Sequence, residues 1–149
     1  VEAGADVICI ADPVSSPDLM SPQDFHDKLM GTITEFADKV NAPVVLHVCG
    51  NVTAILDYMA DCHCKGLSVE EKVEDLAGAV EKTKGRAVMI GNVSSPFVLL
   101  SGDAAKVEEA VKHALDAKVG ILAPGCGIAP MTPTANIQAM VDARDKYFQ

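Results

Sequence analysis

The stretch PVVLHVCG, residues 43–50, is a short apolar run that ends at glycine. Its length, its β-branched content and its bounding Pro and Gly predict a buried parallel strand whose C-terminal end lies near Gly50. His47 and Cys49 stand at that end, and side chains at positions i and i+2 of a strand project to the same side. Active sites of α/β sheets and barrels are assembled at this edge, so we expect the two side chains to share a site.

Strand-like and helix-like segments alternate on both sides of this stretch. Because no two strands are joined by a tight hairpin, the five successive βα units predict an α/β fold with an all-parallel sheet. A complete (β/α)8 TIM barrel takes about 250 residues. We therefore expect five of its eight units here, as one continuous domain. The expected strands span residues 7–11, 43–48, 65–70, 86–92 and 120–123, and the expected helices span residues 22–40, 52–60, 73–83, 104–117 and 133–147.

Composition limits the classes of function. Hydrophobic residues make up 49% of the chain, which predicts an ordered globular domain. The net charge of −9, with 12 basic against 21 acidic residues, argues against nucleic-acid binding. No uninterrupted apolar stretch reaches the roughly 18–20 residues of a membrane helix, so no membrane insertion is expected. Five irregularly spaced cysteines fit a reducing cytoplasm better than a secreted disulfide framework.

A third soft ligand, Cys126, follows the last expected strand in ILAPGCGIAP, residues 121–130. In a barrel, strands far apart in sequence converge at the C-terminal mouth. Two thiolates and an imidazole suit zinc, and three protein ligands leave one tetrahedral position for a substrate or water. The pattern predicts a catalytic zinc site at His47, Cys49 and Cys126. The alternative is that all three are packing residues of the core, as free cysteines often are.

Four acidic or amide residues also stand at expected strand ends. Glu70 is a candidate fourth ligand, and Glu71 is the alternative candidate. The other interpretation of either residue is a solvated carboxylate at the start of a helix. Asp12 and Asn92 are candidate substrate-binding residues, and turn or capping roles are the alternative for both.

Two further groups of cysteine are expected to be structural. The run DCHC, residues 61–64, lies before a strand, on the face that is associated with stability rather than catalysis. We expect Cys62 or Cys64 to face the core. Cys9 lies inside an apolar strand and is also expected in the core.

Four segments together resemble the uroporphyrinogen decarboxylase superfamily. Within it, the chain is similar to the methylcobamide:coenzyme M methyltransferases of methanogens, the MtaA/MtbA type. Their His-x-Cys followed far downstream by Cys matches His47, Cys49 and Cys126. The resemblance covers essentially the whole chain and implies that residues 1–149 are the C-terminal five units of a (β/α)8 barrel, a fragment of a longer chain. The segments are IADPVSSPDLMSP (residues 10–22), LHVCGN (46–51), GN (91–92) and APGCGIAP (123–130).

The resemblance implies a zinc-dependent methyltransferase of methanogenesis. In that reaction the thiol of coenzyme M takes a methyl group from the methylcobamide of a partner corrinoid protein. A metal-bound thiol is deprotonated, which makes it a nucleophile at neutral pH.

Three alternatives remain open. The first is a uroporphyrinogen decarboxylase-like enzyme, which the scarcity of arginine opposes, because Arg86 and Arg144 are the only two. The second is a zinc methyltransferase with another thiol acceptor, such as homocysteine. The third is a metal-binding fragment without activity of its own. Exposed sheet edges would also permit a homo-oligomer.

Overall fold

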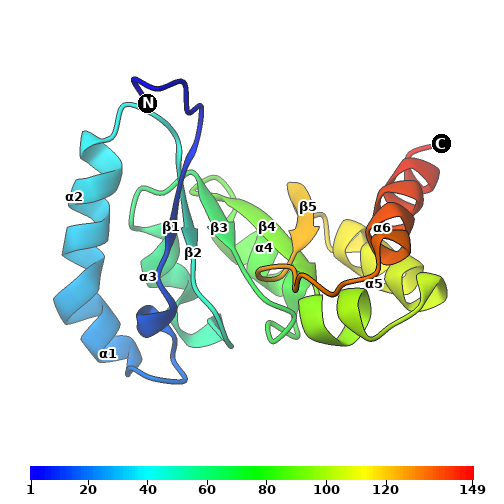
Figure 1. Cartoon of the computed structure of the whole chain (residues 1–149). Coiled ribbons are helices and arrows are strands. Elements are labelled where there is room, and N and C mark those ends of the chain that lie inside the picture. Colours follow the sequence, from blue (N-terminus) through cyan, green and yellow to red (C-terminus); the bar gives the residue numbers. More distant parts are fainter.

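Five strands form one parallel sheet in the computed structural model, which describes residues 1–149. The spatial order is the order in the chain, β1-β2-β3-β4-β5, and each neighbouring pair is parallel (Figure 1). This confirms the α/β prediction, with parallel βα units that form part of a barrel. The strands are β1 (Ile8–Ala11), β2 (Val44–His47), β3 (Gly66–Ser68), β4 (Val88–Val93) and β5 (Ile121–Pro124).

Each strand is followed by helical structure, as predicted. Two expected loops contain short helices, because a side chain caps each at its start: Asp12 accepts from the Ser15 N–H, and Ser94 accepts from the Phe97 N–H. The helical elements are η1 (Pro13–Ser15), α1 (Pro22–Asp24), η2 (Phe25–Met30), α2 (Gly31–Lys39), η3 (Thr53–Ile55), α3 (Leu56–Ala60), α4 (Leu76–Thr83), η4 (Ser95–Leu100), α5 (Ala104–Asp116) and α6 (Thr134–Tyr147).

The main core lies between the helices and one face of the sheet. In β2, Val44 and Leu46 are buried while Val45 and His47 are only partly buried. Leu67 of β3 pairs in register with Leu46 and is fully buried. Because strand side chains alternate between faces, His47 points away from the helices. A buried apolar face thus fixes the direction in which the histidine projects.

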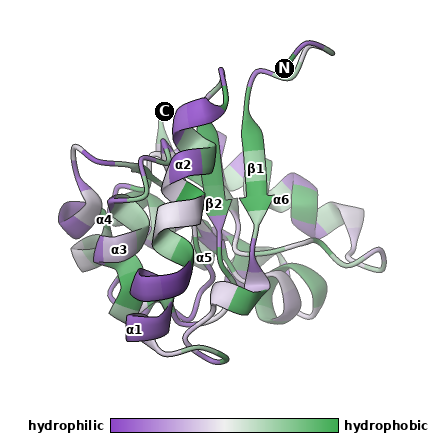
Figure 2. Cartoon of the chain, turned by 90° about the vertical axis from the view of Figure 1, so that its left-hand side faces the viewer, coloured by the Kyte–Doolittle hydropathy of each residue, from purple (hydrophilic) through white to green (hydrophobic).

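The opposite face of the sheet carries no helices. Val88 and Ile121 are about half exposed there, at 45% and 52%. The expectation that Cys9 is in the core is wrong: it is exposed, since it pairs in register with Val45 on this same face. The apolar strand β1 forms one uncovered edge of the sheet (Figure 2). In a closed barrel these positions would point into the interior.

None of the helices combines the length and the apolar character that crossing a bilayer requires.

Candidate metal centre

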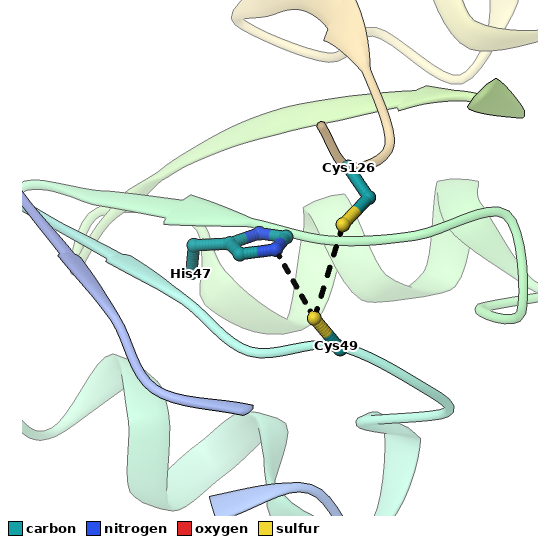
Figure 3. A group of neighbouring side chains, drawn as sticks. All are labelled: His47, Cys49 and Cys126. Carbon is teal, nitrogen blue, oxygen red and sulfur yellow. Dashed lines mark hydrogen bonds between the residues drawn. The ribbon is translucent and has the colours of Figure 1, made fainter. Parts of the chain in front are cut away.

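Three predicted ligands meet at the C-terminal edge of the sheet. His47 is the last residue of β2, Cys49 lies two residues beyond it, and Cys126 lies two residues beyond β5. Their side chains point toward one another from these two places (Figure 3). One ligand atom from each lies within 4.8 Å of the other two. The curvature of the sheet therefore brings together residues whose strands are separated by β3 and β4.

Two of the three spacings between the ligand atoms are close to those of a tetrahedral zinc site. His47 Nε2 lies 3.4 Å from Cys49 Sγ, and Cys49 Sγ lies 3.9 Å from Cys126 Sγ. Zinc bonds of ~2.3 Å to sulfur and ~2.0–2.1 Å to nitrogen, at tetrahedral angles, place a nitrogen and a sulfur about 3.6 Å apart and two sulfurs about 3.8 Å apart. The donor chemistry and these two distances fit zinc, and the ligand atoms of the third pair, His47 and Cys126, lie within 4.8 Å of each other.

Ser68 orients the imidazole of His47. His47 Nδ1 lies 3.2 Å from the Ser68 carbonyl oxygen and 3.1 Å from Ser68 Oγ. A carbonyl only accepts, so the bond to it places the proton on Nδ1 and leaves the Nε2 lone pair facing Cys49. The contact exists because β2 and β3 pair His47 with Ser68 in register. Ser68 was not identified from the sequence, because this relation depends on strand register.

The Cys49 thiol is protonated in the metal-free site. Burial raises its pKa to about 12, and the neighbouring Cys126 thiol and Glu70 carboxylate contribute to the shift. Cysteine binds zinc as the thiolate, so metal binding at Cys49 would release this proton.

Metal affinity should therefore rise with pH. Because the metal-free thiol keeps its proton throughout the neutral range, each pH unit between about pH 6 and about pH 8 should raise the zinc association constant at least tenfold. A competition titration with a chelator of known pH dependence measures this. An association constant that stays flat over the range would show that Cys49 binds no metal.

The two adjacent glutamates differ in direction. Glu70 Oε2 accepts from the Gly50 N–H at 2.9 Å, which places this carboxylate beside Cys49. Glu71 Oε1 instead accepts from Ser94 Oγ at 2.9 Å. The group of ligand atoms within 4.8 Å includes neither. Glu70 is thus the carboxylate next to the site, and Glu71 is engaged in holding the start of η4.

Asp12 and Asn92 both contact protein groups. The Asp12 carboxylate accepts from the backbone N–H and the hydroxyl of Ser15, which gives it a capping role. Asn92 is buried, and its Nδ2 donates to the Glu70 carbonyl at 3.4 Å. Substrate binding by either residue stays a prediction.

Gly50 is the point at which the loop after β1 packs against the site. Its φ is +84°, and a Cβ at this position would lie 2.5 Å from both Ser16 Oγ and Asp18 Oδ2. The loop after β1 therefore packs directly on the residue that follows Cys49, and any side chain there would push the two apart.

The DCHC run lies elsewhere. Cys62 and Cys64 are fully buried in the main core, which confirms that they face it. His63 is exposed, and its Nδ1 lies 2.8 Å from Asp38 Oδ1. Arg86 pairs with Asp57 and Asp61.

A cleft on another part of the chain does not contain the three ligands. It has a volume of about 590 Å³ and lies between the loop after β3 and helix α5. Of the predicted site residues, Asn92 and the alternative ligand Glu71 line it. The other lining residues are Val73, Glu74, Ser94, Val98, Lys106, Glu109, Ala110 and His113.

Comparison with known proteins identifies the family. Residues 1–147 match the family model described as uroporphyrinogen decarboxylase (URO-D). The chain belongs to the uroporphyrinogen decarboxylase family. Within this family it is 55% identical over 148 residues to the methylcobamide:CoM methyltransferase MtaA of Methanosarcina barkeri. It is 38% identical over 151 residues to the methylcobamide:CoM methyltransferase MtbA of Methanosarcina acetivorans.

A solved structure of a methyltransferase from Methanosarcina mazei has the same arrangement. It is 54% identical to this chain and superimposes with a TM-score of 0.97 over 99% of it. The matched part is 44% of that structure's chain, and the MtaA and MtbA relatives are likewise matched over 44% of their length. The uroporphyrinogen decarboxylase family member described here thus spans less than half the length of these methyltransferases.

Proposed function

We propose that this chain carries the metal centre of a zinc-dependent methyltransferase, which transfers a methyl group from a methylated corrinoid protein to the thiol of coenzyme M. The observation that carries the proposal is the group of His47, Cys49 and Cys126, in which two of the three ligand-atom spacings are close to those of a tetrahedral zinc site. The methyltransferase names of the relatives support the reaction class.

The protein's part in the reaction is to hold donor atoms in place. Ser68 presents His47 Nε2, and the two strand ends present the two sulfurs. When bound, zinc supplies a Lewis-acid site at which a coordinated thiol is deprotonated at neutral pH. In the proposed transfer a sulfur–carbon bond would form as the cobalt–carbon bond breaks, the thiol proton would be released, and the electron pair of the broken bond would stay on the corrinoid.

Glu70 is proposed as the fourth ligand in the absence of substrate. Its carboxylate is held beside Cys49 by the Gly50 N–H. A substrate thiolate that replaces one carboxylate leaves the net charge of the centre unchanged. The exchange therefore avoids placing an additional charge in a partly buried site.

We also propose that the chain is the C-terminal part of a (β/α)8 barrel. The face without helices exposes Val88 and Ile121, and both edge strands pair on one side only. Three further βα units would cover that face and pair with both edges. A homo-oligomer would cover the same surfaces, and the mass of the isolated chain in solution distinguishes the two.

Methyl transfer from free methylcobalamin tests the function. The zinc-loaded chain should methylate coenzyme M slowly, because the pocket lacks the proposed additional units, and should not methylate homocysteine. Loss of the methylcobalamin absorption and mass detection of the product measure the reaction. Preferential methylation of homocysteine would contradict the proposed acceptor, and equal rates with and without zinc would contradict the metal centre.

A further inference from the structure

The loop that carries Cys126 has few restraints of its own. Before the cysteine, the Gly125 N–H donates to the Val93 carbonyl at 2.7 Å. After it, Gly127 has no neighbouring atom within 4 Å of a Cβ position, and Ile128 is 47% exposed. The backbone of residues 126–128 makes a single hydrogen bond, from Ser95 Oγ to the Cys126 carbonyl at 3.0 Å. This bond is the restraint that acts on the backbone of the cysteine.

Ser95 is in turn held firmly. It is 5% exposed and is the first residue of η4. The preceding Ser94 uses its hydroxyl twice, donating to Glu71 and accepting from the Phe97 N–H at 3.2 Å. These two hydrogen bonds connect the start of η4 to the loop after β3, and they hold the backbone next to Ser95 in place.

The backbone just before Cys126 is closely packed. A Cβ on Gly125 would lie 3.1 Å from Glu70 Cα and 3.2 Å from Glu71 Oε2. The backbone just before Cys126 is thus packed against the loop after β3, while the backbone just after it is open. The orientation of the Cys126 peptide, and with it the direction of the Cα–Cβ bond, depends on the bond to Ser95.

We propose that Ser95 is a positioning residue that aims the Cys126 sulfur at Cys49 and His47. The inference rests on the proposed metal centre. It assigns a positioning role to a hydroxyl outside the ligand set, which acts through the Cys126 backbone carbonyl, whereas Ser68 contacts the imidazole of His47 directly. Hydrogen-bond partners of ligand groups typically change metal affinity 10- to 100-fold.

Cobalt(II) binding to the 149-residue chain tests this role. Thiolate-to-cobalt charge-transfer absorption reports how many thiolates bind, and a titration gives the affinity. Ser95→Ala should weaken cobalt binding by about 10- to 100-fold and lower the absorption per bound cobalt toward that of Cys126→Ala. Ser95→Thr keeps the hydroxyl and should recover most of both signals.

Ser101→Ala is the matched control, because Ser101 is exposed at the other end of η4 and makes no side-chain hydrogen bond. It should bind cobalt as the unmodified chain does. Unchanged affinity and absorption in Ser95→Ala, or an equal loss in Ser101→Ala, would overturn the role of Ser95. An unmodified chain that binds no cobalt would instead overturn the metal centre, and the inference with it.

Discussion

Replacing Cys126 with alanine is expected to lower zinc affinity by more than 100-fold. The substitution removes one of the two proposed sulfur donors, which lie 3.9 Å apart. Loss of a ligand should exceed the 10- to 100-fold effect of losing a partner of a ligand. The folded state of the metal-free chain should change little, because Cys126 is only partly buried. Competition with a chelator measures the affinity, and thermal unfolding of the metal-free chain measures the stability.

Cys62→Ala is the matched control and should have the opposite result. Cys62 is fully buried in the core, so its loss should lower the unfolding temperature and leave zinc affinity unchanged. Equal losses of affinity in Cys62→Ala and Cys126→Ala would move the metal site to the DCHC run. An unchanged affinity in Cys126→Ala would remove that residue from the ligand set.

Leu67→Ala is expected to lower the free energy of unfolding by about 2–5 kcal/mol. Leu67 lies on the central strand β3, is 0% exposed, and pairs in register with Leu46 and Met89. Truncation leaves a cavity between the sheet and the helices, in the part of the core that sets the position of Ser68 and hence of His47. Urea unfolding of the metal-free chain measures the change.

Leu19→Ala provides the control for the same chemical change at the surface. Leu19 is 74% exposed in the loop after β1, so its truncation should alter the free energy of unfolding by less than about 0.5 kcal/mol. Similar losses for the two variants would mean that the helix-covered face is not the core of the folded chain.

The fold could be predicted because the strands have a simple pattern. Short apolar runs that end at Gly, Asp or Asn alternate with helix-like segments, and no hairpin joins two strands. The short helix η4 was missed, since its formation depends on the cap at Ser94 and on the bond from Ser94 to Glu71, which lies 23 residues earlier. The exposure of Cys9 was missed because an apolar strand at a sheet edge has the same sequence pattern as a buried strand.

The three candidate ligands could be found from local sequence rules, but the residues that position them could not. His47 and Cys49 obey the i, i+2 rule of a strand, and Cys126 follows a strand end between two glycines. The sequence could not tell which of Glu70 and Glu71 points toward the ligands. The direction of each side chain depends on where β3 ends, which is at Ser68. Ser68 and Ser95 are ordinary residues in the sequence, and only strand register and loop packing bring them to the site.

The proposed metal centre consists of His47, Cys49 and Cys126 around one zinc ion, with one position open to a thiol. Zinc-edge X-ray absorption of the zinc-loaded chain, with and without coenzyme M, tests it most directly. We expect one zinc per chain, with two sulfurs at about 2.3 Å and nitrogen or oxygen at about 2.0–2.1 Å, and a third sulfur when coenzyme M is added. A metal shell without sulfur, or one that stays unchanged on addition of coenzyme M, would contradict it.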